Sequence, residues 1–130
     1  MSKKVLKLDV SPNAPCPIVV HDDIASADAH VVHVFDEIDI DNSKDLEAEI
    51  MGTDARQFIV IELSDCRYMD SSGITVLMRA YRHFGERLRI VVGLRSNVGR
   101  VISMLGLHGV LPLADSLEEA LLEAAPAKAS

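Results

Sequence analysis

The sequence predicts an α/β fold with a mostly parallel sheet of about four to five strands, joined by crossover helices. Three observations point to this class. Beyond about residue 40, short apolar runs alternate with segments of helical periodicity. The run at 57–63 is rich in apolar, β-branched residues, as expected of a strand covered on both faces. Aromatic residues make up only 4% of the chain and Trp is absent, so the core must be aliphatic, which suits a parallel sheet flanked by helices.

The first half of the chain predicts strands followed by one helix. A short apolar alternation lies within residues 1–15, ahead of several prolines, and predicts an N-terminal extension or an edge strand. Short β-type runs at 18–20 and 30–35 predict two neighbouring strands. A helix capped by Asn42 or Ser43, with Leu46 and Ile50 on one face, is then expected to end near Gly52.

The second half repeats one strand and one helix. The strand at 57–63 precedes a helix that begins near Ser71, with an apolar stripe formed by Ile74, Leu77, Met78 and Tyr81. A strand at 88–94 precedes a helix whose apolar positions are Val98, Val101, Ile102 and Leu105 and which ends at Gly106.

The C-terminal part predicts a short strand and a last helix. The segment 110–113 contains Pro112, which lacks an N–H group, so we expect this strand at an edge or a strand end. Ser116 and Glu119 form a capping box that opens the last helix. We place one domain at 16–124 and expect residues 125–130 to be a disordered tail.

Composition limits the classes of partner and location. The chain has 130 residues, 20 acidic and 13 basic, with a net charge of −7, which argues against a nucleic-acid or anionic membrane surface and favours a basic partner. Cys16 and Cys66 show neither metal nor redox spacing and predict reduced thiols. No signal peptide is evident, and no apolar run approaches the roughly 18 residues that span a bilayer. We expect a cytoplasmic protein with no metal and no cofactor.

The most informative motif is the turn at 70–73, between the buried strand and the following helix. Asp and Ser are favoured N-cap residues because their side-chain oxygens accept hydrogen bonds from unpaired N–H groups of the first turn. A helix N-terminus also favours added negative charge, so a serine hydroxyl there is a candidate phosphate acceptor. The residues alone leave both interpretations open, a cap and a phosphorylation site.

Residues 68–74 resemble the phosphorylation signature of STAS domains, specifically that of bacterial anti-sigma factor antagonists. The segment 36–39 resembles the Gly-Glu-Leu-Asp turn of that family, with Asp36 in the glycine position, which leaves the conformation of this turn open. The segments 94–107 and 116–121 resemble the third and the closing helices of the family. The resemblance extends over about residues 16–124.

The resemblance implies a partner switch in transcription regulation and stress response. The unphosphorylated protein would bind an anti-sigma factor serine kinase, which would phosphorylate Ser71, and a PP2C-type phosphatase would reverse the reaction. Further implied sites fall into two sets. The phosphorylation loop would comprise Asp70, Ser72 and Gly73, and the kinase-facing residues would be Glu37, Asp39 and Met69.

Two other functions remain open in the sequence. A STAS scaffold without switching, such as a stressosome or transporter-associated subunit, would share the fold. A small hydrolase would use Ser71 or Ser72 with a histidine base, but the sequence contains no Gly-x-Ser-x-Gly elbow. The chain also lacks a glycine-rich lysine loop for a nucleotide, so we expect a phosphorylation substrate and not an enzyme.

Overall fold

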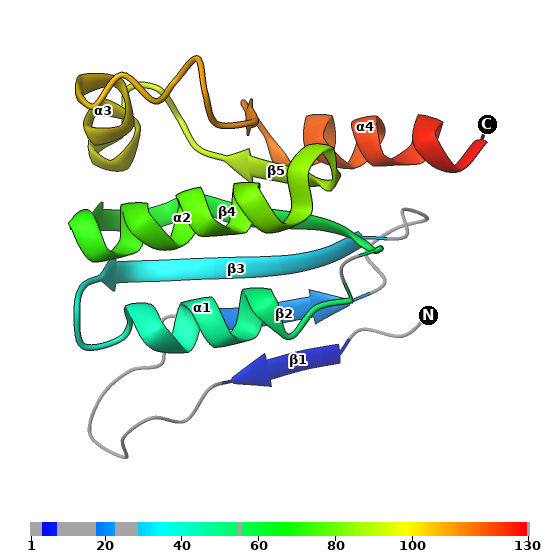
Figure 1. Cartoon of the computed structure of the whole chain (residues 1–130), viewed down its shortest axis with the longest axis horizontal. Helices are drawn as coiled ribbons and strands as arrows, with labels where there is room; N and C mark the ends of the chain where they lie inside the picture. Colours follow the sequence, from blue (N-terminus) through cyan, green and yellow to red (C-terminus); the bar gives the residue numbers. More distant parts are fainter. Residues whose placement is uncertain (1–3, 8–17, 23–28, 55, 130) are drawn as a thin grey trace.

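A six-stranded sheet, with its strands in sequence order, forms the centre of the molecule (Figure 1). The computed structural model describes residues 4–7, 18–22, 29–54 and 56–129, with side chains at 29–54 and 56–123. The first three strands pair antiparallel, and the third to sixth pair parallel, which confirms the mostly parallel α/β class. The strands are β1 (Lys4–Lys7), β2 (Ile18–Asp22), β3 (Ala29–Ile38), β4 (Phe58–Met69), β5 (Leu88–Val91) and β6 (Leu113–Ala114).

Helices cover both faces of the sheet. Leu46 of α1, Leu77 of α2 and Ile102 of α3 join the larger apolar core on one face, whereas Ala120 of α4 packs into a smaller core on the other. Full burial of such a leucine or isoleucine stabilises the fold by about 1.5–3 kcal/mol. The helices are α1 (Ser43–Met51), α2 (Ser71–Phe84), α3 (Asn97–Met104) and α4 (Leu117–Ala129), and a 3₁₀ turn, η1 (Gly85–Arg87), follows α2.

The strand β4 is buried on both faces over its first half, as the sequence predicts. Ile59 and Ile61 belong to the larger core, and Val60 belongs to the smaller one. The strand then continues to Met69, six residues past the predicted end, with its polar residues exposed. The strand β3 likewise continues past Phe35 to Ile38, which pairs with Met69. The sequence does not predict these extensions because exposed polar residues interrupt the apolar pattern there, although Ile38, Cys66 and Met69 still belong to the larger core.

Other boundaries also differ from the predictions. The strand β5 ends at Val91 and not at 94, and the short edge strand lies at Leu113–Ala114, just after Pro112. The helix α4 extends to Ala129, beyond the predicted end of the domain at 124. Of the predicted apolar stripes, Met78 and Leu105 are exposed. The described part of the predicted N-terminal extension forms the edge strand β1, which pairs with β2.

Asp36 adopts a backbone conformation that residues other than glycine rarely adopt. Its φ angle is 57°, and it is the one non-glycine residue with a positive φ among the described residues. The register between β3 and β4 shifts at Asp36 and Glu37, so the strand has an irregularity there. This conformation explains why glycine suits the position in the turn that this segment resembles.

We expect the variant Asp36→Gly to be more stable than Asp36→Val by about 1–2 kcal/mol, because a β-branched residue at positive φ is strained. Both variants remove the same carboxylate, so surface charge does not contribute to the difference. Urea denaturation followed by circular dichroism measures it. The same pair at Glu37 is the control, and there valine should be the more stable residue because it favours strands. Equal stability of the two Asp36 variants would contradict the strain.

Candidate functional site

The turn between β4 and α2 is organised by the Asp70 carboxylate. Asp70 is the N-cap of α2, and its Oδ1 accepts hydrogen bonds from the backbone N–H of Ser72 at 2.9 Å and of Gly73 at 3.4 Å. The Ser72 hydroxyl donates to the same oxygen at 2.5 Å. The predicted cap is therefore confirmed, and one carboxylate oxygen accepts from three donors in the first turn of the helix.

These contacts also set the charge of the cap. The hydrogen bond from the Ser72 hydroxyl is the main cause that lowers the pKa of Asp70, and backbone N–H groups of the turn lower it further. Partial removal of the carboxylate from water raises the pKa, but this effect is smaller than the combined effect of the hydrogen bonds. Asp70 is consequently a fixed negative charge beside both serines at neutral pH.

The two serines of the motif have different environments. Ser71 is exposed at the first position of α2, and its backbone carbonyl accepts a hydrogen bond from the Thr75 hydroxyl at 2.8 Å. Ser72 is partly buried, and its hydroxyl is held by Asp70. Of the two, Ser71 is therefore the serine that a modifying enzyme can reach without breaking the cap.

Gly73 allows the start of α2 to lie directly against the sheet. A Cβ atom at this position would lie 2.3 Å from Met69 Cγ and 2.9 Å from Ile38 Cγ2, closer than such atoms approach one another. Met69 is only 1% exposed. This burial differs from the expectation that Met69 faces a partner: its side chain supports the loop from beneath.

The predicted acidic residues lie at the same edge of the sheet as Ser71. The backbone N–H of Asp70 donates to the carbonyl of Ile38 at 3.1 Å, which joins the end of β3 to the loop. Glu37 is exposed and Asp39 is partly exposed, on either side of that carbonyl. The structure thus brings Glu37 and Asp39 next to the loop through the backbone.

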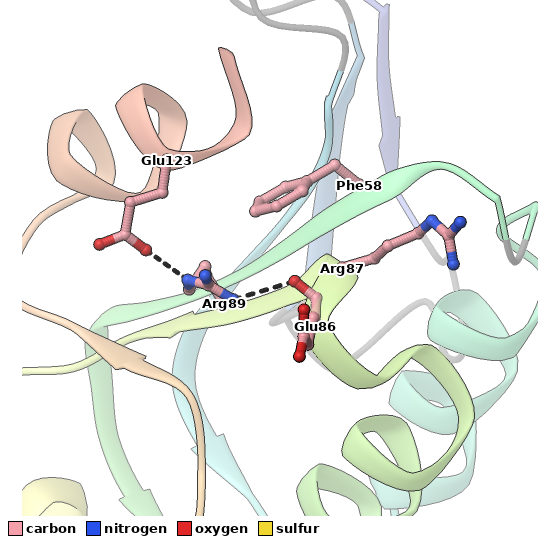
Figure 2. A pocket seen from close by; sticks show the side chains of 5 residues that line it. All are labelled: Phe58, Glu86, Arg87, Arg89 and Glu123. Atoms are coloured by element: carbon pink, nitrogen blue, oxygen red, sulfur yellow. Dashed lines mark hydrogen bonds and ion pairs between the residues drawn. The ribbon is translucent and has the colours of Figure 1, made fainter. Parts of the chain in front are cut away.

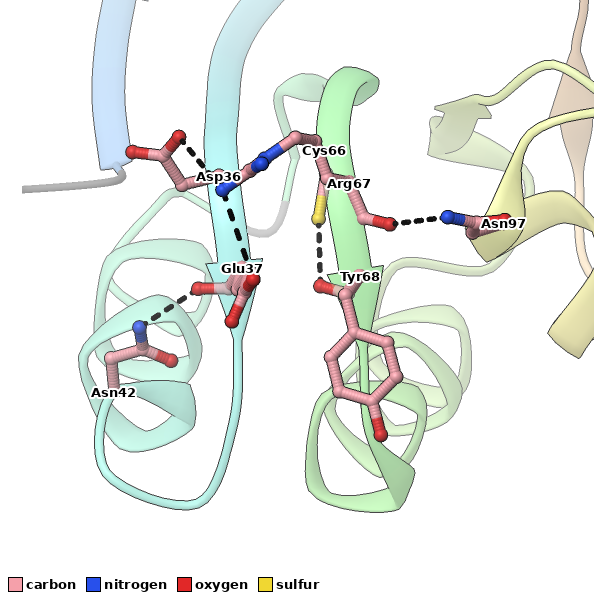
Figure 3. Close-up of polar contacts among 7 residues, drawn as sticks. All are labelled: Asp36, Glu37, Asn42, Cys66, Arg67, Tyr68 and Asn97. Carbon is pink, nitrogen blue, oxygen red and sulfur yellow. Dashed lines mark hydrogen bonds and ion pairs between the residues drawn. The ribbon is translucent and has the colours of Figure 1, made fainter.

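Asn42 holds the acidic turn in shape. Its side-chain oxygen accepts from the backbone N–H of Asp39 at 2.9 Å. Its amide donates to the carbonyl of Glu37 at 3.0 Å (Figure 3). Asn42 is the N-cap residue of α1 but makes no side-chain cap bond to that helix. The predicted N-cap position is therefore confirmed, although the Asn42 side chain bonds the turn before the helix and not the helix itself.

Arg67 was not identified from the sequence, although it bridges the two strands. Its guanidinium lies 3.9 Å from the Asp36 carboxylate and 3.7 Å from that of Glu37, and its backbone carbonyl accepts from the Asn97 amide at 3.3 Å (Figure 3). The Arg67 side chain is 71% exposed, so these ion pairs add little stability. The parallel register of β3 and β4, which the sequence does not specify, brings these residues together.

Three exposed apolar side chains lie at the same edge of the sheet as Ser71. Ile40 follows β3, Tyr68 lies near the end of β4 and Leu94 follows β5, with exposed fractions of 72%, 48% and 56%. The carboxyl ends of parallel strands meet at one edge of a sheet, so these three residues share the edge with Ser71. The position of Ile40 between Asp39 and Asp41 was a signal in the sequence, since an isoleucine in an acidic turn has no predicted core to enter.

The described residues give no sign of a metal centre or of a reactive thiol. They contain no group of three or more His, Cys, Asp or Glu side chains that could hold a metal ion. Burial raises the pKa of the Cys66 thiol to about 11, so this thiol stays protonated at neutral pH. Cys16 lies outside the described residues. In the part of the chain that is described, none of the helices has the length and apolarity needed to cross a bilayer.

Known proteins share this fold. Residues 17–120 match the family model described as STAS domain. An anti-sigma factor antagonist from Mycobacterium paratuberculosis is 26% identical, with a TM-score of 0.71 over 88% of this chain and 97% of that chain. The phosphorylated Bacillus cell fate determinant SpoIIAA is 20% identical, with a TM-score of 0.55 over 82% and 96%. The murine anion transporter Solute Carrier 26 family member A9 is 17% identical, with a TM-score of 0.63 over 95% of this chain and 22% of that chain. The last two likenesses, at their lower identities, establish the fold alone.

The variant Gly73→Ala is expected to lower the free energy of unfolding by about 1–2 kcal/mol, because overpacking against Met69 and Ile38 exceeds the gain in helix propensity. Denaturant unfolding measures the change. Gly109→Ala is the matched control, since a Cβ there meets no atom within 4 Å and the φ angle is not positive. If both variants lose the same stability, close packing at Gly73 is not the cause.

The variant Asp70→Asn tests the charge of the cap, because it keeps an oxygen acceptor and removes the ionisation. Since folding lowers the pKa of Asp70, the ionised group stabilises the fold above its unfolded pKa of about 4, and this contribution is lost as the pH falls through the folded pKa. The stability advantage of the wild type should therefore be constant above about pH 5 and shrink below about pH 4. Denaturant titrations across this range measure it, and an advantage that persists or grows in acid would contradict the shifted pKa.

Proposed function

Because this chain belongs to the STAS domain family, we propose that it is an anti-sigma factor antagonist whose binding to an anti-sigma factor serine kinase is switched off by phosphorylation of Ser71. The likeness to the mycobacterial anti-sigma factor antagonist, over nearly the whole of both chains, supports this class of function. The resemblance of residues 68–74 to the phosphorylation signature of that class supports the choice of site.

The observation that carries the proposal is the difference between the two serines. Ser71 is exposed at the start of α2, whereas the Ser72 hydroxyl is bound to the Asp70 carboxylate. A kinase must bring the acceptor oxygen in line with the transferred phosphoryl group, which requires an accessible hydroxyl. Ser71 meets this requirement without disturbance of the helix cap.

The electrostatics of the loop support the direction of the switch. A phosphoryl group adds a charge of about −1.5 to −2 at neutral pH. It would stand next to the ionised Asp70 and at the same edge as the acidic residues Glu37 and Asp39. A partner surface complementary to the unmodified loop would then face added like charge, which opposes binding. The unphosphorylated protein is the binding form in this proposal.

The surface around Ser71 suits a protein partner. It combines the exposed apolar residues Ile40, Tyr68 and Leu94 with the acidic turn after β3. Apolar anchors surrounded by charge are typical of protein interfaces. The kinase would contribute a basic surface with apolar hollows, and a PP2C-type phosphatase would restore the unmodified serine. This function belongs in the cytoplasm, and in it the chain acts as the substrate and not as the catalyst.

The alternative is a STAS scaffold that does not switch, such as a stressosome or transporter-associated subunit. The fold that this chain shares with the murine anion transporter fits this alternative. That likeness gives no support to any particular switch residue. The two functions differ in their dependence on Ser71. A scaffold requires the surface of the domain, whereas a switch requires a single modifiable hydroxyl.

Incubation of the purified protein with native lysate, ATP and magnesium is expected to place one phosphate on Ser71, because this is the exposed hydroxyl of the loop. Phosphosite mapping by mass spectrometry measures it. Ser71→Ala should abolish the modification, and Ser72→Ala should retain it. Thr75→Ala is a second control, since Thr75 lies one turn along the same exposed helix face. No phosphate in an active lysate, or phosphate on another residue, would favour the scaffold.

A further inference from the structure

A groove of about 300 Å³ opens between α2 and the segment that follows α3. It is lined by apolar side chains and one cation, namely Met78, Tyr81, Arg82, Val110 and Leu111. Tyr81 and Leu111 pack against the larger core and form the inner part of the lining, whereas Met78 and Val110 are exposed beside them. The groove thus offers apolar surface that the fold leaves open to another molecule.

Both walls of the groove are held in shape by backbone hydrogen bonds. The Leu107 carbonyl accepts from the backbone N–H groups of Val110 and Leu111, both at 2.9 Å, so the segment after α3 forms a closed turn. The other wall is the helix α2, on which Met78 and Arg82 are four residues apart and therefore lie on one face. A partner that enters a preformed groove pays little for ordering it.

Arg82 gives the groove a positive charge that the fold does not use. Its side chain is exposed, and among the described residues no ion pair involves its guanidinium. The described residues that line the groove include no acidic side chain. The groove therefore suits a partner that presents an apolar side chain beside a carboxylate. The basic surface proposed above for the kinase would meet like charge at Arg82, so the kinase is not the occupant that the charges favour.

The chain itself presents an apolar side chain beside carboxylates at the turn after β3. Ile40 is 72% exposed and lies between Asp39 and Asp41. Asp41 is exposed too, and within the described part of the chain its carboxylate forms no ion pair. In Figure 1 the turn lies below α2, where β3 passes into α1, whereas the segment after α3 lies above α2. Since Ile40 is exposed, it does not occupy the groove of its own molecule.

We propose that this chain self-associates, with the Ile40 turn of one copy seated in the groove of a second copy. Ile40 packs between Met78 and Val110 of the second copy, and the Asp41 carboxylate pairs with its Arg82. Each copy carries both the turn and the groove, so a two-fold pair makes the contact twice and closes. Ile40 also belongs to the surface that the proposed function assigns to the kinase. Under that function, a second copy and the kinase compete for the same turn, but the self-association does not depend on it.

Sedimentation equilibrium of the purified full chain tests the proposal, at concentrations up to about 1 mM because contacts of small area are weak. The wild type is expected to show a monomer–dimer equilibrium. Ile40→Ser should weaken association about tenfold or more, because it removes the apolar anchor. Leu122→Ser is the matched control, since Leu122 is an exposed apolar residue of α4 outside the turn and the groove. A monomeric wild type, unchanged association in Ile40→Ser, or equal loss in both variants would overturn the proposal.

An exchange of charges tests the ion pair of the contact. Arg82→Asp and Asp41→Arg should each weaken association about tenfold or more, because each variant puts like charges together in both contacts of the pair. An equimolar mixture of the two variants should associate again, because every contact of the mixed pair joins opposite charges. Both positions are exposed, so the fold is retained. A mixture that associates no better than either variant alone would overturn the contact between Asp41 and Arg82.

Arg87→Asp controls for the change in net charge. Arg87 is an exposed arginine five residues beyond Arg82, and it lines a separate cavity, together with Phe58 and Arg89 (Figure 2). Arg87→Asp should leave self-association unchanged, because Arg87 does not line the groove. Weakening by Arg87→Asp to the same extent as by Arg82→Asp would show a general effect of charge and would overturn the assignment.

Discussion

The geometry of the turn at 70–73 depends on the close approach of α2 to the sheet. Gly73 lies so near Met69 and Ile38 that an added side chain would overlap them, and the Asp70 N–H donates to the Ile38 carbonyl. These contacts fix the first turn of the helix on the ends of β3 and β4. The Asp70 carboxylate then meets the donors of that turn, and Ser72 is drawn inward. The exposure of Ser71 follows from this packing.

In the proposed switch, a phosphate on Ser71 alters recognition more than it alters the fold. The N-terminus of α2 favours an added anion by about 0.3–1 kcal/mol. Like charges juxtaposed across an interface cost several kcal/mol. Since Asp70 is already ionised and the turn after β3 is acidic, the larger effect falls on the approach of a partner. A loop rigid enough to keep its shape can therefore still act as a switch.

The sequence predicts those features that depend on local chemistry or on one apolar face. The class of the fold, the Asp70 cap and the edge position of the last strand belong to this group. The ends of β3 and β4 do not belong to it. Their polar residues adopt strand conformation because the two strands pair with each other, which the local sequence does not indicate. The burial of Met69 also depends on tertiary structure, since methionine fits a core or an interface equally well. The bridge from Arg67 to Glu37 depends on a register that no local signal specifies.

Asp36 shows how surface chemistry and backbone strain compete in one residue. A positive φ angle favours glycine, yet this chain has a carboxylate there, within 3.9 Å of the Arg67 guanidinium. The exposed ion pair is worth at most about 1 kcal/mol, which is comparable with the strain and does not exceed it. Stability alone therefore gives no reason for aspartate at this position. What aspartate adds is a negative charge beside Glu37, on the strand that leads to Asp39. Departures from the locally favoured residue concentrate at functional surfaces, and this one lies on the acidic edge that a partner would meet.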